Sequence, residues 1–197
     1  RGLGSSATCI IAGLMGANYL SKSNLNKEEI LKLATEIEGH PDNVAPAIYG
    51  NMIVSFMEDE KIYYDTIKVP KNLRFCALIP DFKLSTEKAR GVLPKTIDHK
   101  DGVFNVSRAT LLVTAFMNNN LELLKVACND KIVTYSNKLN CLGTFLSGAG
   151  PTIMSLTSDD DKDFLPDMES YLLSLDNKWQ IKDLHCDYNG VVVNIID

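Results

Sequence analysis

Long apolar segments and clusters of basic residues are both missing from this 197-residue chain. The longest apolar stretch, residues 7–20, is interrupted by Gly13, Gly16 and Asn18, so it is too short and too polar to span a membrane. No basic segment followed by an apolar run and a small-residue cleavage site is present, which argues against export. The formal net charge is −5 and Lys and Arg are dispersed, so we expect no nucleic-acid partner.

No two of the five cysteines lie close enough in the sequence to form a closely spaced metal-binding pair. The number of cysteines is odd, and we expect reduced core thiols in a cytoplasmic protein. Hydrophobic residues make up 45% of the chain and charged residues 23%, as in an ordinary globular protein. The cysteines are Cys9, Cys76, Cys128, Cys141 and Cys186.

A loop rich in glycine and serine, residues 1–7 (RGLGSSA), precedes a helix signal. Glycine lets several backbone N–H groups turn toward one point, and the following helix adds the positive end of its dipole, so such a loop suits phosphate. The hydroxyls of Ser5 and Ser6 could donate to phosphate oxygens or coordinate magnesium. The common phosphate-binding loop, GxxxxGK followed by Ser or Thr, is absent. By itself the loop leaves nucleotide binding and an ordinary tight turn equally open.

Helices and strands are expected along the whole chain. The helix expected at residues 7–20 is predicted to be buried. Asn189-Gly190 is typical of a two-residue hairpin loop, and the acidic run 159–161 indicates a solvated helix start rather than a metal site. Helices are predicted at residues 7–20, 24–38, 85–90, 105–116, 121–128 and 159–175. Strands are predicted at residues 50–56, 61–69, 73–79, 142–146, 152–156, 181–186 and 191–196.

The second predicted helix has the clearest end signals. Asn26 is expected to cap it, with Glu29 as the partner in a capping box, and Gly39 and Pro41 end it. The residues that follow, 40–43, therefore fall on an irregular turn. Helical spacing predicts an inward stripe of Ile30, Leu33, Ala34 and Ile37, and a solvent-facing side of Lys27, Glu28, Lys32 and Thr35.

The order of elements indicates an α+β protein. From residue 73 onward, strands and helices alternate in a way that suits an α/β sandwich, with helices on one face of an antiparallel sheet. A domain boundary is expected between residues 66 and 72. The first portion looks incomplete, because the strand that should support the opening loop is absent.

Three segments together resemble the GHMP small-molecule kinases over nearly the whole chain: RGLGSSA at residues 1–7, EGHPDNVAPA at 38–47 and LSGAGPT at 146–152. The middle segment resembles the homoserine kinases in particular. The resemblance implies a GHMP kinase-like two-domain architecture. Residues 1–68 would be the C-terminal part of an ATP-binding N-terminal domain, an incomplete ribosomal-protein-S5-like fold, and residues 69–197 a C-terminal domain built as a ferredoxin-like α/β sandwich.

The activity that the resemblance implies is phosphorylation of the side-chain hydroxyl of L-homoserine by ATP with Mg²⁺, a step toward threonine. A GHMP kinase for another small alcohol, of the mevalonate or sugar type, is the first alternative. A non-catalytic GHMP-like binding domain is the second. No membrane partner is expected, and a homodimer is left open.

The resemblance also implies roles for residues at the nucleotide site. Magnesium would be held by Ser6 and Glu38, with Glu36 as the alternative carboxylate; a hydroxyl, a carboxylate and phosphate oxygens are suitable ligands for this hard cation. The ATP phosphates would be wrapped by Arg1, Gly2, Leu3, Gly4, Ser5, Ser6, Ala7 and Thr8.

On the acceptor side, Asp42 and Asn43 match the family's acidic turn beside the reacting hydroxyl. We rank Asp42 as an orienting group first and a base second, because phosphoryl transfer through a loose transition state asks little of a base. Arg90 would grip the substrate carboxylate with its guanidinium. The remaining substrate residues would be His40, Gly148 and Gly150.

Each of these residues also has an ordinary structural interpretation. His40 could close a helix end, Arg90 could be a solvated helix residue and Glu38 a surface carboxylate. The glycines of 148–150 could form a hairpin turn. The order and spacing of the three segments favour the functional interpretation.

The chain departs from the family pattern in two places. Family members carry a stretch before the glycine-serine loop that holds adenine-side elements, and the segment after residue 132 is short here. We therefore expect a truncated chain without a complete ATP pocket, whose exposed sheet edges favour aggregation or dimerisation.

Overall fold

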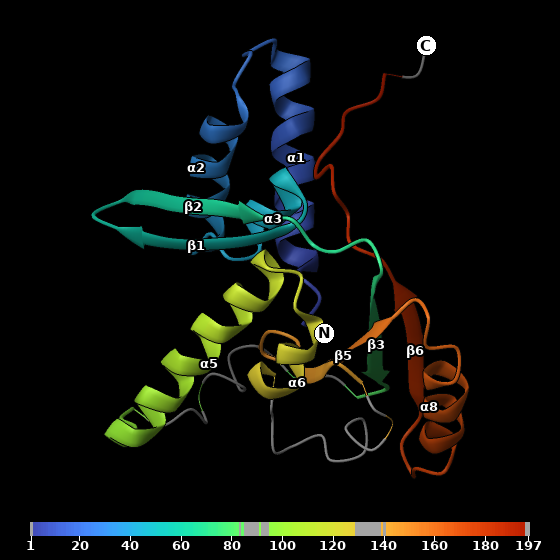
Figure 1. Ribbon diagram of the computed structural model, residues 1–197. Coiled ribbons are helices and arrows are strands. Elements are labelled where there is room, and N and C mark those ends of the chain that lie inside the picture. Colours follow the sequence, from blue (N-terminus) through green and yellow to red (C-terminus); the bar gives the residue numbers. More distant parts are fainter. Residues whose placement is uncertain are drawn as a thin grey trace. The chain divides into compact units, whose positions relative to one another are not determined.

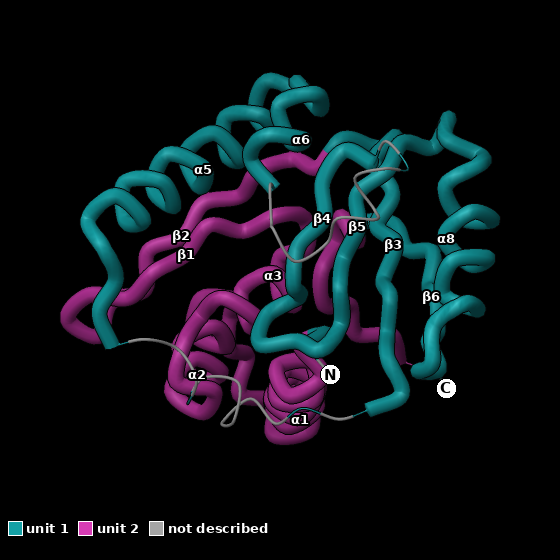
Figure 2. The backbone as a smooth tube through the Cα atoms, turned by 90° about the horizontal axis from the view of Figure 1, so that it is seen from below, with its two compact units in different colours: residues 1–3, 70–186 teal, residues 4–69, 187–197 magenta. Residues whose placement is uncertain are grey.

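The computed structural model describes residues 2–82, 84, 91, 95–128, 139 and 141–195 (Figure 1). These residues form two compact units (Figure 2). One unit comprises residues 1–3 and 70–186, and the other comprises residues 4–69 and 187–197. The helix predicted at residues 85–90 lies outside the described residues. The functional domains predicted at 1–68 and 69–197 stay a prediction.

The unit of residues 4–69 and 187–197 combines three helices with a β-hairpin. The helices are α1 (Ser5–Ser21), α2 (Lys27–Glu38) and α3 (Val44–Tyr49). Strands β1 (Met52–Glu58) and β2 (Lys61–Ile67) pair antiparallel, as the sequence predicted. Alternate hairpin residues, among them Ile53, Ile62 and Tyr64, pack against the helices. The core of this unit is Ala7, Ile11, Ile30, Leu31, Ala34, Val44, Ala45 and Ile48.

Helix α1 confirms the predicted helix but not its predicted burial. Only Ala7 and Ile11 are buried in it, whereas Leu20 is 80% exposed. The reason is that α2 and α3 cover one narrow stripe of α1 in this unit. None of the described helices combines the length and the apolar character needed to cross a bilayer.

The ends of α2 are as the sequence predicted, but its buried face is partly different. The Asn26 side chain accepts hydrogen bonds from the backbone N–H groups of residues 28 and 29, and the Glu29 carboxylate accepts one from the Asn26 N–H, so the capping box is confirmed. Leu31 and Thr35 are buried with Ile30 and Ala34. The predicted stripe was therefore wrong at Leu33 and at Ile37, which is 61% exposed, and Thr35 does not face water.

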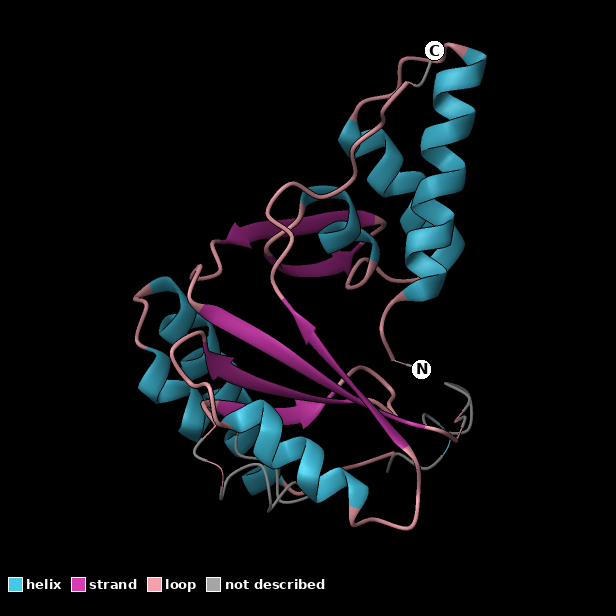
Figure 3. Cartoon of the chain, turned by 90° about the vertical axis from the view of Figure 1, so that its right-hand side faces the viewer, coloured by secondary structure: helices cyan, strands magenta, loops and turns pink. Residues whose placement is uncertain are grey.

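The other unit contains a sheet of four antiparallel strands in the order β4-β5-β3-β6 (Figure 3). Numbered along the chain, these strands lie in the order 2-3-1-4, as in ferredoxin-like sheets. The strands are β3 (Leu73–Pro80), β4 (Gly143–Leu146), β5 (Ile153–Ser158) and β6 (Trp179–Leu184). The helices are α5 (His99–Met117), a short 3-10 turn η1 (Leu121–Leu123), α6 (Leu124–Ala127) and α8 (Phe164–Leu173).

Helix α8 packs on one face of this sheet. Phe164 and Met168 contact Cys76 and Leu78 of β3 in a buried cluster. The acidic run marks the start of the helix, as predicted: the Asp161 carboxylate accepts hydrogen bonds from the backbone N–H groups of residues 163 and 164, at 3.2 and 3.0 Å.

None of the five cysteines forms a disulfide bond. Cys76 and Cys141 are buried, and burial raises the pKa of the Cys76 thiol to about 12 and that of Cys128 to about 11. Cys9 is exposed on α1, so the expectation of core thiols was wrong at that position.

The hairpin predicted around Asn189-Gly190 is wrong. Strand β6 pairs with β3, and residues 191–195 form no strand. The Asp187 carboxylate instead accepts hydrogen bonds from the N–H groups of residues 189 and 190, which turns the chain toward α3. There the Asn51 N–H donates to the Asp187 carbonyl at 2.7 Å, and the Val191 N–H donates to the Ile48 carbonyl at 3.2 Å.

Gly190 is the position where this tail comes closest to α3. Its φ is +67°, and a Cβ added there would lie 2.2 Å from the Ile48 carbonyl oxygen. Gly190→Ala is expected to lower the free energy of unfolding by roughly 2–5 kcal/mol, because it adds backbone strain and a clash with the main chain. Urea unfolding measures the change.

Gly13→Ala is the matched control, because a Cβ there meets nothing within 4 Å and the residue lies inside α1. It should raise the free energy of unfolding by about 0.5–1 kcal/mol. A Gly190→Ala protein as stable as Gly13→Ala would contradict the contact between the tail and α3.

Candidate active site

The glycine-serine loop takes a left-handed backbone conformation at both of its glycines. Gly2 has φ +78° and Gly4 has φ +68°, and Gly4 is the N-cap residue from which α1 starts at Ser5. The Thr8 N–H and hydroxyl both donate to the Gly4 carbonyl at 3.1 Å. The amides of the first turn have no partner within the helix and lie at the positive end of the 17-residue dipole of α1. This arrangement suits an anion.

The loop between β4 and β5 holds Gly2 within the same unit. The Ser147 hydroxyl donates to the Gly2 carbonyl at 2.6 Å. A Cβ on Gly2 would lie 2.3 Å from the Ser147 carbonyl oxygen and 3.1 Å from that of Gly150. Gly148 lies against Gly2 too, with the Gly2 carbonyl oxygen 3.8 Å from the place of its Cβ. The structure therefore brings Gly148 and Gly150, predicted as substrate residues, against Gly2.

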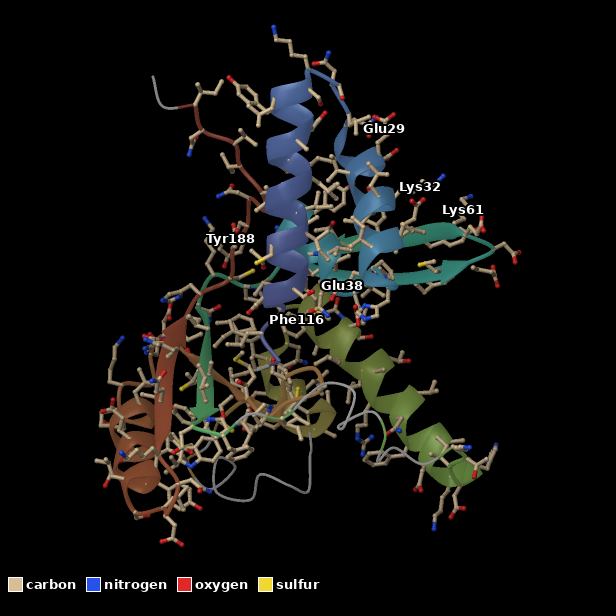
Figure 4. All side chains as sticks on the ribbon, turned by 180° about the vertical axis from the view of Figure 1, so that it is seen from behind. Glu29, Lys32, Glu38, Lys61, Phe116 and Tyr188 are labelled. Carbon is tan, nitrogen blue, oxygen red and sulfur yellow. The ribbon has the colours of Figure 1, made fainter. Side chains whose placement is uncertain are left out.

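Ser6 and Glu38, the predicted magnesium ligands, are in direct contact. The Ser6 hydroxyl donates to Glu38 Oε2 at 2.9 Å. Glu38 is the last residue of α2 and its side chain lies beside the start of α1 (Figure 4). Gly39 ends α2 with φ +91°, which lets the chain turn immediately after this carboxylate. Glu36, the alternative, is exposed on α2.

The turn between α2 and α3 groups three of the predicted residues. His40 Nδ1 lies against Asp42 Oδ1, and Asn43 Nδ2 donates to the same oxygen at 3.3 Å. The Asn43 side-chain oxygen faces Gly4, since a Cβ on that glycine would lie 3.3 Å from it. The turn and the start of α1 are thus neighbours within one unit.

For some of the predicted residues the structure shows no side chain at the candidate site. Ala7 is fully buried in the helical core, so only its backbone N–H could serve a ligand. Arg1 and Arg90 lie outside the described residues. Ser147 was not among the predicted site residues, although its place in the third sequence segment signalled a role in supporting the loop.

The chain matches known proteins along nearly its whole length. Residues 1–51 match the family model of the GHMP kinases N terminal domain, and together with the relatives that follow this match places the chain in the class of GHMP kinases. A homoserine kinase of Clostridium botulinum (strain ATCC 19397 / Type A) is 50% identical over 98% of this chain and 70% of its own length. A homoserine kinase of Clostridium beijerinckii is 44% identical with the same coverage. The chain therefore belongs to the homoserine kinase family.

A solved structure supports the fold. The crystal structure of a homoserine kinase from Cytophaga hutchinsonii matches with a TM-score of 0.87 at 24% identity, and the match covers 96% of this chain and 67% of that one. The GHMP kinase fold and the α+β class predicted from the sequence are thus confirmed. The chain spans about 70% of the length of the curated relatives it matches.

The close contact at Gly2 gives a prediction for nucleotide binding. Gly2→Ala is expected to raise the dissociation constant for ATP at least tenfold, about 1.4 kcal/mol, because the loop must move away from the Ser147 carbonyl to admit the methyl group. Calorimetric titration with a non-hydrolysable ATP analogue measures it. Gly16→Ala, where a Cβ meets nothing within 4 Å, is the control. Equal affinities of the two variants would contradict a role for this loop in binding phosphate.

Proposed function

We propose that the protein transfers the γ-phosphoryl group of ATP to the side-chain hydroxyl of L-homoserine, forming O-phospho-L-homoserine and ADP in threonine biosynthesis. The observation that carries the proposal is the convergence of three chemical groups at the start of α1. The Ser6 hydroxyl, the Glu38 carboxylate and the Asn43 amide all lie there, next to amides that suit phosphate. The 50% identity to a homoserine kinase supports the choice of substrate.

Magnesium fits the residues at this position. Ser6 and Glu38 offer hard oxygen ligands that already lie within 2.9 Å of each other. No group of three or more His, Cys, Asp and Glu side chains in the described ranges could hold a metal ion, so the protein would supply two ligands and the nucleotide phosphates further ones. When bound, the ion would offset charge on the transferring phosphoryl group.

The turn after α2 would bind and orient the acceptor hydroxyl. Asp42, whose side chain is 64% exposed, would orient the reacting hydroxyl, with Asn43 beside it. His40, Arg90, Gly148 and Gly150 are proposed to contact the substrate. Proximity and orientation of this kind supply much of the rate enhancement in phosphoryl transfer.

We also propose a cytoplasmic location and leave a homodimer as the candidate assembly. The reaction consumes ATP, and five cysteines without a disulfide bond suit a reducing compartment. The proposed domain division at residues 68 and 69 separates the first three helices and the β1–β2 hairpin from the four-stranded sheet.

The substrate is tested with the whole gene product that carries this sequence. ADP release, measured by a coupled assay, is expected with L-homoserine and magnesium, and far less release with mevalonate or galactose as the acceptor. Removing magnesium with EDTA should abolish it. If a folded protein shows no homoserine-dependent turnover, the proposal is wrong.

Glu38 is tested against its neighbour on the same helix. Glu38→Gln keeps the shape of the side chain but removes a charged ligand, so kcat/KM is expected to fall about 100-fold and the magnesium concentration for half-maximal rate to rise. Glu36→Gln is the matched control, because that residue is exposed on α2. If Glu36→Gln raises the magnesium requirement and Glu38→Gln does not, the metal ligand has been assigned to the wrong carboxylate.

A further inference from the structure

We propose that Asn51 anchors a hinge between the two compact units. It fastens two of the three places where the chain passes from one unit to the other, so that these two crossings bend as one joint. This role is conformational, and it is independent of the reaction that the protein catalyses.

The chain passes between the units at three places. These crossings are Leu3–Gly4, Val69–Pro70 and Cys186–Asp187. The first crossing lies inside the glycine-serine loop. The other two adjoin the four-stranded sheet, because β3 begins at Leu73, soon after the second crossing, and β6 ends at Leu184, soon before the third.

In the unit that contains this sheet, the second and third crossings leave from neighbouring strands. β3 and β6 pair antiparallel, and Phe75 lies opposite Leu184, so the start of β3 and the end of β6 lie side by side. Just before β3, Lys71 and Asn72 are exposed, and within the part of the chain that the structure describes their backbone N–H groups form no hydrogen bond. A short segment of this kind bends at little cost in free energy.

In the other unit, Asn51 holds the chain at both of these crossings. Its side-chain oxygen accepts a hydrogen bond from the Val69 N–H at 3.4 Å, and its side-chain nitrogen donates to the Tyr188 carbonyl at 3.2 Å. Its backbone N–H donates to the Asp187 carbonyl at 2.7 Å. One residue thus binds the chain directly before the second crossing and directly after the third.

The surroundings of Asn51 are closely packed. Its φ is +58°, a left-handed conformation that asparagine tolerates better than most residues with a side chain. The preceding residue, Gly50, has φ +72°, and a Cβ there would lie 2.7 Å from the Gly190 nitrogen. Val69 is only 6% exposed. The joint is therefore fixed within this unit, and a change of angle must be taken up outside it, before β3, after β6 and in the glycine-serine loop.

The hinge is tested by a distance measurement in the whole gene product without substrate. Spin labels are attached through genetically encoded keto amino acids at Leu20 and Leu173, which are 80% and 88% exposed and belong to different units. Asn51→Gly keeps the left-handed backbone but removes both side-chain hydrogen bonds, so the distance distribution from pulsed electron paramagnetic resonance should widen about twofold. Asn119→Gly is the matched control, because Asn119 has φ +51° and its side chain makes no hydrogen bond to any described residue.

Asn51→Asp separates the two side-chain hydrogen bonds. It keeps an acceptor for the Val69 N–H but places an oxygen that cannot donate against the Tyr188 carbonyl. This variant should widen the distribution as well, with the Val69 amide still protected from hydrogen exchange, whereas in Asn51→Gly that amide should exchange about tenfold faster.

Three results would overturn the hinge. They are an unchanged width in Asn51→Gly, an equal widening in Asn119→Gly, and a wild-type width in Asn51→Asp. Thermal unfolding verifies that each variant is folded, and Asn51→Asp decides the question if Asn51→Gly does not fold. Because no substrate is present, a lack of homoserine turnover would overturn the proposed function without affecting this result.

Discussion

The close packing of α1, α2 and α3 is the constraint on which the candidate site depends. Ala7 and Val44 have no exposed surface, and the small size of their side chains lets the helix backbones approach one another. Both also adjoin predicted site residues in the chain, because Ala7 follows Ser6 and Val44 follows Asn43. A displacement of the helices by a fraction of an ångström would therefore move the hydroxyl and the amide with them. The buried side chains thus set the geometry of the neighbouring residues to which the proposed function assigns the chemistry.

If a nucleotide binds at the candidate site as proposed, local electrostatics rather than the overall charge would have to attract it. With a formal net charge of −5, the field of the whole chain disfavours a polyphosphate. The amides at the start of α1 and the proposed cation beside Glu38 would overcome this only at short range, where water and salt screen their charges least. The first turn of α1 contains no acidic side chain, so the positive end of its dipole is not neutralised from within the helix.

The sequence predicted those features that are decided by neighbouring residues. Asn26 and Glu29 formed the capping box because both partners lie within one helical turn. The burial of Leu31 in place of Ile37 could not be predicted from the sequence. The apolar side chains of α2 cover much of its circumference, so the face that turns inward depends on where α1 and α3 lie. The motif likewise pointed to Asp42, but the hydrogen bond from the Asn43 amide to one of its oxygens depends on side-chain torsions that residue spacing does not reveal.

The tail of the chain, residues 187–191, supports helix α3. Helix α3 has only six residues, too few to be stable alone, so it needs tertiary support at both ends. At its start the turn with Asn43 faces Gly4, and at its end the Ile48 carbonyl accepts from Val191 while the Asn51 N–H donates to Asp187. Residues that come last in the sequence thus close the helix that begins at the candidate catalytic turn. Weakening the contacts of the tail should therefore displace Asn43, because a short helix that loses its support at one end becomes less ordered at the other end as well.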